Sequence, residues 1–379
     1  MLTTVRLSVA ILTCVVVAAS ASDDLFSEDY FIARSRFRAA VERAGGRLTA
    51  LELDAVGPAG EDLTIDIAWF GSEEPRRVLV HCSGTHGSEA FAGSAIQLQL
   101  LEDGIPPLPE DGAICLVHVL NPYGMAWLRR VNENNVDLNR NFLAPDKTYT
   151  GAHPLYRQMD SLLNPKSPPS RDMFFARVGW FVLRHGMAKM KQAVAGGQYE
   201  YPGGLFFGGA ELEDGPRQYT AYMAERLTGV ERVVGIDVHT GLGSFGEDML
   251  LVAKELLDTP AYDTMRDVYG DRVTLLAPTV KDVYTIRGAH KSWYPRAFPT
   301  ATQYLMTQEV GTYSGIKVLH ALREENRGHH YGGKSLDHST KRKLKQAFTP
   351  EKDRWRQAVL RLGRQRIEQA RQLAFGSSE

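Results

Sequence analysis

Residues 80–89 read Val-His-Cys-Ser-Gly-Thr-His-Gly-Ser-Glu, in which an apolar strand is followed directly by the first turn of a helix. His86 and Glu89 lie three residues apart in this turn. Their side chains can converge there on one metal ion, and zinc accepts both imidazole nitrogen and carboxylate oxygen. The alternative is a histidine that is hydrogen-bonded within the turn, beside a glutamate that favours a helix start.

A second strand offers a further ligand. Residues 233–241 read Val-Val-Gly-Ile-Asp-Val-His-Thr-Gly, and His239 stands where the apolar run ends. Sites in α/β sheets gather at the carboxyl ends of the strands. We therefore predict that His86, Glu89 and His239 form a His2Glu site for one zinc ion per chain, with one coordination position left open for water.

Short apolar or β-branched runs predict strands, and one helix is expected between the last two of them, at 88–102. The strand runs are 48–53, 63–70, 77–83 and 113–120. Strands that alternate with helices indicate an α/β fold, here a three-layer α/β/α sandwich with a mixed, mostly parallel central sheet. We expect a single catalytic domain over residues 22–379.

The composition is that of an ordinary globular protein, because 43% of the 379 residues are hydrophobic and 23% are charged. The formal net charge of −1 gives no reason to expect a nucleic-acid partner. One dense basic run, residues 341–345, is interpreted as a solvated face.

Cys82 and Cys115 lie in apolar strand runs and are expected to be buried free thiols, although a disulfide is the alternative in an oxidising compartment.

The N-terminus has the three parts of a secretory signal: Arg6, an apolar run over 7–18, and Ala19-Ser20-Ala21. We predict cleavage after Ala21, so that residues 1–21 are removed, the protein is secreted or periplasmic, and no stable membrane insertion remains. The alternative is an uncleaved anchor or a buried helix, but the run is shorter than the roughly 20 residues of a spanning helix.

Three prolines at positions 165, 168 and 169 indicate a break in regular structure and predict an insertion at about 148–216. It contains a helix-like stretch over 172–195 and a glycine-rich segment over 201–209. The insertion could overhang the cleft as a lid or wall, or pack on its own aromatic side chains as a surface embellishment. A C-terminal helical extension is expected from about residue 350, with an amphipathic helix to residue 375.

Further motifs follow in order: Asn-Pro-Tyr-Gly at 121–124, Arg129-Arg130, Asp-Leu-Asn-Arg-Asn-Phe at 137–142 and Gln-Glu-Val-Gly-Thr-Tyr at 308–313. Together with the two histidine motifs they resemble, over about residues 50–320, the zinc carboxypeptidases of the carboxypeptidase A superfamily. The segment Tyr-Pro-Gly-Gly-Leu-Phe-Phe-Gly-Gly at 201–209 resembles a hallmark of a bacterial branch of that superfamily, which is related also to aspartoacylase and succinylglutamate desuccinylase.

The resemblance implies roles for several residues near the zinc. Glu309 would be the general base and acid, and Arg130 would steady the oxyanion, with Arg129 as a possible substitute. Asp137 would orient a ligating histidine, and Asp237 could serve His239 in the same way or simply begin a turn.

The resemblance also implies a substrate site. Asn139 and Arg140 would clamp a terminal carboxylate, Tyr284 would cap the substrate, and Lys291 would read its terminal side chain. The alternative for the clamp is Arg140 in an ordinary ion pair with Asn139 capping a turn, and the alternative for Lys291 is a side chain in solvent.

The function implied is that of a metallocarboxypeptidase, a zinc-dependent hydrolase that cleaves an amide bond at the carboxyl end of a peptide, with the zinc-bound water as nucleophile. The alternatives are a zinc-dependent N-acyl amino acid deacylase and a non-catalytic carboxylate-binding relative. The expected partner is a peptide or N-acyl amino acid with a free carboxylate.

Overall fold

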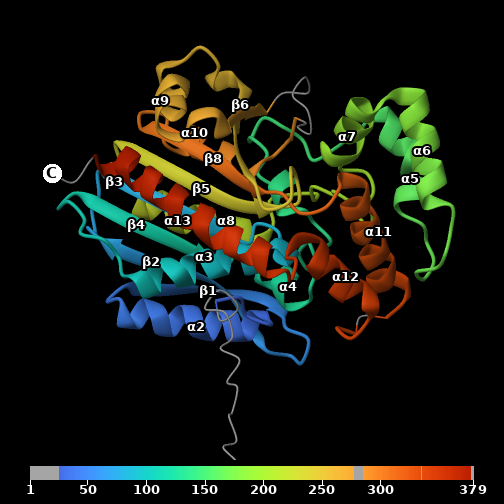
Figure 1. Ribbon diagram of the computed structural model, residues 1–379, viewed down its shortest axis with the longest axis horizontal. Coiled ribbons are helices and arrows are strands. Elements are labelled where there is room, and N and C mark those ends of the chain that lie inside the picture. The colour runs from blue at the N-terminus through green and yellow to red at the C-terminus, as the bar shows by residue number, and fades with distance from the viewer. Residues whose placement is uncertain (1–24, 277–284, 334, 377–379) are drawn as a thin grey trace, which may run out of the picture.

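The computed structural model describes residues 25–276, 285–333 and 335–376. The predicted signal peptide and Tyr284 lie outside these residues. The centre of the fold is an eight-stranded sheet with the strand order β1-β2-β4-β3-β5-β8-β6-β7 (Figure 1). The strands are β1 (Arg47–Val56), β2 (Asp62–Gly71), β3 (Arg77–Ser83), β4 (Gly112–His118), β5 (Arg232–Thr240), β6 (Asp248–Ala253), β7 (Val273–Leu276) and β8 (Thr302–Val310).

Parallel pairs join β4 to β3, β3 to β5, β5 to β8 and β6 to β7. Antiparallel pairs join β1 to β2, β2 to β4 and β6 to β8. The predicted mixed, mostly parallel sheet is therefore confirmed.

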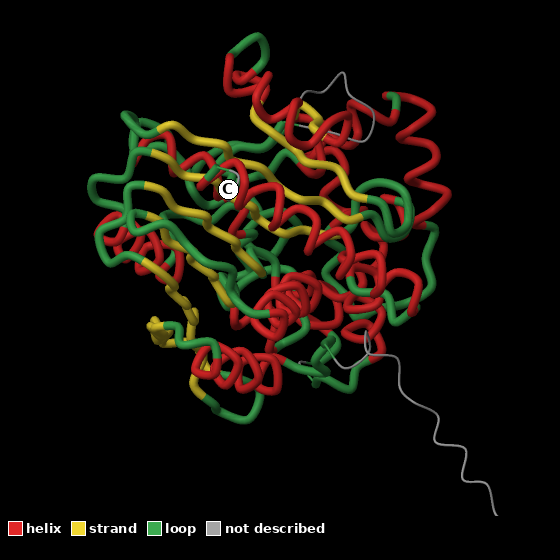
Figure 2. Tube along the Cα trace, turned by 60° about the vertical axis from the view of Figure 1, so that its left-hand side comes forward, coloured by secondary structure: helices red, strands yellow, loops and turns green. Residues whose placement is uncertain are grey.

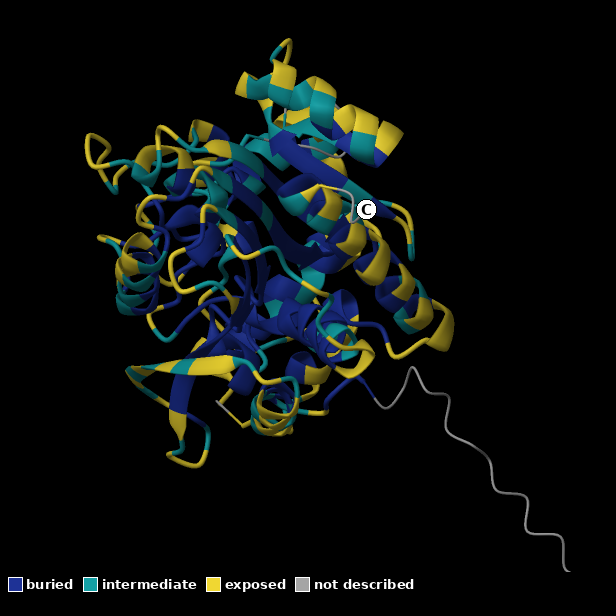
Figure 3. Cartoon of the chain, turned by 90° about the vertical axis from the view of Figure 1, so that its left-hand side faces the viewer, coloured by how far each residue is buried: buried dark blue, intermediate teal, exposed yellow. Residues whose placement is uncertain are grey.

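Helices cover both faces of the sheet (Figure 2). Alternate residues of β3 explain why, since Leu79 packs into one apolar cluster while Val78 and Val80 pack into another on the opposite face. The first cluster contains side chains of α2 (Tyr30–Arg43), α3 (Ala90–Asp103), α9 (Pro260–Tyr269) and α13 (Asp353–Phe375), and the second those of α8 (Asp214–Arg226) and α10 (Tyr294–Ala297). Figure 3 shows the buried strands between helices whose outer sides are exposed.

The insertion forms helices α5 (Pro154–Leu163), α6 (Phe174–His185) and α7 (Met187–Ala195), which lie beside α11 (Gly315–Tyr331) and α12 (Ser339–Phe348) at one end of the sheet (Figure 1). The single helix expected over 172–195 is two helices, because Gly186 adopts a φ of +81° between them. The C-terminal helix is present as α13. Short helical segments complete the chain: α4 (Pro122–Ala126), η1 (Gly87–Glu89), η2 (Leu138–Arg140), η3 (Lys254–Leu256), η4 (Gly270–Arg272) and η5 (His290–Trp293).

Two smaller expectations have different outcomes. The basic run at 341–345 is not wholly solvated, because Lys341 is buried and its Nζ lies 2.7 Å from Glu325 Oε1 on α11. Cys82 and Cys115 are buried free thiols, as expected. Within the described ranges, no helix combines the length and the apolarity that a membrane span requires.

Candidate active site

Strand register brings the predicted zinc ligands together. β3 pairs with β5 and β5 pairs with β8, so that His239 lies directly opposite Glu309, and the turn after β3 carries His86 and Glu89 to the same edge. Parallel strands end on the same side of a sheet, which is why residues far apart in the chain meet here. The turn packs closely against α4 because residue 87 is a glycine. A Cβ at this position would lie 1.9 Å from the carbonyl carbon of Gly124, which is too close for any other residue.

The three side chains converge on one point. His86 Nδ1 lies 3.0 Å from Glu89 Oε1, His239 Nδ1 lies 3.3 Å from Glu89 Oε2, and the two Nδ1 atoms lie 3.0 Å apart. All three residues are buried. Two imidazoles and one carboxylate are a donor set that catalytic zinc sites use, so the residues present fit this metal.

Each histidine is held from behind by an aspartate. His86 Nε2 lies 3.0 Å from Asp137 Oδ1, and His239 Nε2 lies 2.9 Å from Asp237 Oδ2. Burial alone would raise the pKa of Asp137, but the charges of Arg130 and Arg140 hold this pKa well below its usual range. Carboxylates in this position fix the ring orientation of ligating histidines, and the Nδ1 atoms are thereby turned toward Glu89.

Glu309 ends β8 beside the triad. Its Oε1 accepts a hydrogen bond from Leu242 N at 2.9 Å. Burial and the nearby negative charge of Glu89 raise the pKa of Glu309 to about 7. A carboxyl group with such a pKa can exchange a proton near neutral pH, as a general base or acid must.

Of the two adjacent arginines, Arg130 is the one at the triad. Its Nη1 lies 2.6 Å from Glu89 Oε1 and its Nε lies 3.1 Å from Asp137 Oδ2. Arg129 is buried on another side, where its Nε lies 3.1 Å from Glu325 Oε1 of α11. The oxyanion role of Arg130 stays a prediction.

Arg140 does not line the cavity beside the triad. Its side chain is fully buried, and it donates hydrogen bonds to the carbonyl oxygens of Ala195, at the end of α7, and Asn139. Asn139 does line the cavity, and its Oδ1 accepts a hydrogen bond from His290 N at 3.0 Å. Of the two residues expected to clamp a carboxylate, Asn139 is accessible from the cavity and Arg140 is not. The clamp stays a prediction.

Lys291 lines the cavity and donates a hydrogen bond to the carbonyl oxygen of Leu251. Burial lowers its pKa to about 8, and the charge of Asp237 partly offsets that shift. The alternative of a lysine in open solvent does not describe this side chain. Its role in reading the substrate stays a prediction.

The cavity has a volume of about 470 Å³, which is within the usual range of roughly 300–1,000 Å³ for small-molecule sites. The triad and Glu309 lie at one wall, and apolar side chains of the insertion and of α11 form much of the rest: Val178, Met187, Met190, Val194, Leu319 and Leu322. The insertion is therefore a wall of the cavity. Phe206, from the glycine-rich segment, also lines the cavity, and the centre of its ring lies 5.5 Å from the Arg130 guanidinium. The sequence analysis did not predict this contact.

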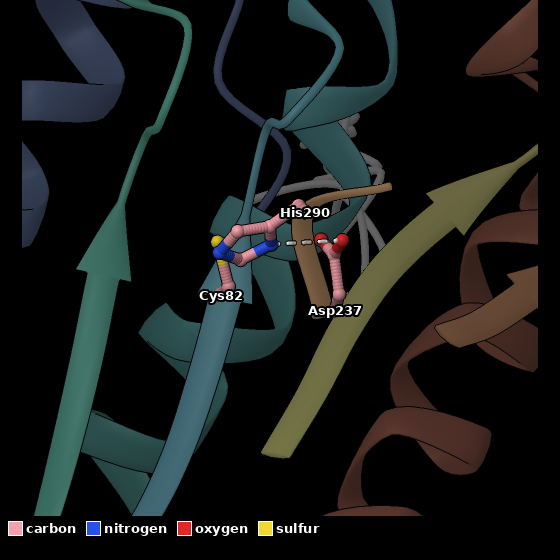
Figure 4. A group of neighbouring side chains, drawn as sticks. All are labelled: Cys82, Asp237 and His290. Atoms are coloured by element: carbon pink, nitrogen blue, oxygen red, sulfur yellow. Dashed lines mark hydrogen bonds and ion pairs between the residues drawn. The ribbon is translucent and has the colours of Figure 1, made fainter. Parts of the chain in front are cut away.

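His290 is a site neighbour to which the sequence assigned no role. Its Nδ1 lies 3.2 Å from Asp237 Oδ2, and Cys82 lies beside its ring (Figure 4). Burial keeps the Cys82 thiol neutral by raising its pKa well above the usual value, and Asp237 already interacts with His239 and Thr85. Cys82, Asp237 and His290 form a second group of potential ligands. We interpret this group as a hydrogen-bonded environment that holds Asp237 in place, and not as a metal site.

Comparison with solved structures finds distant likenesses. Carboxypeptidase A from Helicoverpa armigera is 14% identical, with 86% of this chain and 75% of that chain covered and a TM-score of 0.45. A metallo-carboxypeptidase from Pseudomonas aeruginosa, in complex with (2-guanidinoethylmercapto)succinic acid, is 15% identical, with coverages of 89% and 69% and a TM-score of 0.40. Murein-tripeptide amidase from Escherichia coli O157 is 18% identical, with coverages of 74% and 91% and a TM-score of 0.36.

Two of these solved structures are carboxypeptidases, the class that the sequence motifs resemble. The relation to aspartoacylase stays a prediction. Comparison with curated proteins finds no match. A family model described as "Protein of unknown function (DUF2817)" matches residues 26–362, which is most of the chain. The chain belongs to the DUF2817 family.

Proposed function

We propose that this protein is a zinc-dependent metallocarboxypeptidase, which hydrolyses an amide bond at the carboxyl end of a peptide. One observation carries the proposal: His86, Glu89 and His239 converge at the carboxyl ends of adjacent strands, and Glu309 stands next to them with a pKa raised to about 7. A structural site needs only ligands, whereas a hydrolytic site also needs a group that moves protons.

Zinc bound by the triad would supply Lewis-acid chemistry, polarising the scissile carbonyl and making water more acidic. Glu309 accepts the proton of the attacking water and later delivers it to the departing amine nitrogen. Arg130 places a fixed positive charge beside the triad and stabilises negative charge that develops on the carbonyl oxygen. Asp137 and Asp237 keep the two imidazole rings in their orientation throughout.

We place the substrate's terminal carboxylate near Asn139 and its terminal side chain near Lys291, because both residues line the cavity beside the triad. Lys291 donates a hydrogen bond to a backbone carbonyl oxygen in surroundings that are largely apolar, where a carboxylate would stabilise its positive charge further. A substrate with an acidic terminal residue would satisfy this requirement.

A second candidate is a zinc-dependent N-acyl amino acid deacylase, and the apolar cavity favours it. The side chains of α6, α7 and α11 could accommodate an acyl group as well as a peptide side chain. Mass spectrometry of a library of peptides and N-acyl amino acids, incubated with zinc-loaded protein, separates the two. Release of C-terminal residues from peptides supports the first, and release of fatty or other acids supports the second. If the zinc-loaded protein releases neither kind of product, neither proposal holds.

The Lys291→Glu variant is expected to change the substrate preference. Wild-type protein should cleave peptides ending in Glu with a higher kcat/KM than peptides ending in Lys or Leu, and the variant should reverse the order of Glu and Lys, because like charges repel and opposite charges attract across a water-poor cavity. Each preference should amount to roughly tenfold or more, as expected for the pairing of a buried charge. An unchanged rank order in the variant would show that Lys291 does not read the substrate.

A matched control is Lys254→Glu. Lys254 is a lysine on η3 with an exposed side chain, and it is not among the residues that line the cavity. Its charge reversal should leave the rank order of the three peptides unchanged, since water screens exposed charges.

A further inference from the structure

The insertion carries an exposed apolar face on α6. Five large hydrophobic side chains between residues 173 and 187 are at least 38% exposed, and Leu183 is 87% exposed. The five residues are Met173, Phe175, Trp180, Leu183 and Met187. They are half of all the large exposed hydrophobic residues in the described chain, and α6 lies at the outer edge of the molecule (Figure 1). Several large exposed apolar side chains on one short segment are typical of a binding face.

Both sides of α6 are apolar. Phe174, Val178 and Phe181, spaced by four and three residues, are buried against the rest of the insertion and α11. Trp180 and Leu183 follow the same spacing on the opposite, exposed side. Large apolar side chains on the outer side of a helix are normally covered, so the outer face of α6 fits an apolar partner, although Arg177 and Arg184 lie on the same helix.

The charges around this face have one sign. Residues 173–199 contain no Asp or Glu, and their basic residues away from the cavity lining are Arg177, Arg184 and Lys189. The guanidinium of Arg184 lies 5.5 Å from the centre of the Trp180 ring, at the exposed face itself. The acidic residues that flank this segment are already paired, Asp172 with Arg323 and Arg327, and Glu200 with Arg157. The partner must therefore be apolar and anionic.

These two requirements select among partners. A two-fold dimer would place this basic face against its own copy, where like charges repel. An anionic lipid surface offers both an apolar interior and negative headgroups, and helices that lie in such a surface combine Trp, Phe and Leu with flanking Lys and Arg. We propose that the outer face of α6, together with Met173 and Met187, docks the protein on an anionic membrane surface without spanning it. This proposal goes beyond the proposed hydrolase activity and does not depend on it.

Docking would also place the substrate cavity near the lipid. Val178, on the inner side of α6, and Met187, at the start of α7, both line the cavity beside the triad. Met187 therefore belongs to both, and the docking face adjoins the cavity at α6 and α7.

The test is cosedimentation of the purified protein with vesicles of phosphatidylcholine, with and without phosphatidylglycerol. Wild-type protein should bind vesicles that contain phosphatidylglycerol and bind pure phosphatidylcholine more weakly, and added salt should weaken the binding because it screens the basic residues. Leu183→Asp should weaken binding about tenfold or more, because an apolar side chain that enters the lipid is replaced by a charged one that is costly to bury and is repelled by the anionic headgroups. Leu183 is so exposed that the change should not affect folding, which thermal unfolding checks.

The matched control is Ile32→Asp, on α2 at the opposite side of the molecule (Figure 1), where an equally apolar side chain is 41% exposed. It should bind vesicles as wild type does. All variants share the same N-terminal residues, so a difference between them reports on α6 alone. Equal binding by wild type and Leu183→Asp, or no binding to phosphatidylglycerol, overturns the proposal. A dimer in sedimentation that Leu183→Asp dissociates would overturn it too, by assigning the face to a second copy.

Discussion

Protein with His86→Ala or His239→Ala is expected to lose its zinc, whereas the wild-type protein carries one zinc ion per chain. The two imidazoles and Glu89 are the whole of the protein's ligand set in the proposed site. Loss of a direct ligand should cost more than the roughly 10- to 100-fold in metal affinity that loss of an outer partner costs. Elemental analysis after zinc-replete preparation and dialysis measures the occupancy.

The fold should survive these changes, because each aspartate behind a histidine keeps another partner. Asp137 retains Arg130, and Asp237 retains His290 and Thr85. His290→Ala is the matched control: it removes a buried histidine next to Asp237 but no ligand of the triad, so zinc should remain. Wild-type protein that stays metal-free, or His239→Ala protein with full occupancy, would refute the His2Glu site.

Glu309→Gln is expected to keep its zinc and its fold and to lose turnover. The amide has the shape of the carboxyl group and can still accept the hydrogen bond from Leu242 N, but it cannot take a proton from water. General-base effects are roughly 10²- to 10⁴-fold, and the loss should be at the upper end or beyond because the same group later acts as the acid.

Three quantities are measured for wild-type and Glu309→Gln protein: kcat with the best substrate from the library, the zinc content and the unfolding temperature. Glu255→Gln is the control, since Glu255 is a carboxylate on η3 with an exposed side chain away from the cavity. It should match wild type in all three measurements. If the Glu309→Gln variant turns over within a few-fold of wild type, another residue is the base.

The sequence by itself determined the class of the sheet and the edge at which the triad lies, but it did not predict strands β6 and β7. Alternating strands and helices predict a mostly parallel α/β sheet, and parallel strands end at one edge. His86 lies in the turn that follows one apolar strand, and His239 lies at the end of another. Their approach therefore follows from the local sequence pattern and from the rule that parallel strands end at one edge of the sheet. The sequence also pointed to Asp137 and Asp237 as candidates for orienting the ligating histidines. In the structure, each aspartate lies about 3 Å from a histidine of the triad.

Only the tertiary structure decided which of several equivalent side chains face the cavity. Arg130 rather than Arg129 reaches the triad because Glu325, almost 200 residues away in the chain, binds Arg129. Arg140 is turned from the cavity by the carbonyl oxygen of Ala195, and Lys341 is buried against Glu325. These outcomes depend on contacts between segments remote in sequence, which periodicity and spacing do not encode. Local pattern determines where a strand ends, but the direction of a long cationic side chain depends on which acceptor the packed fold brings within its reach.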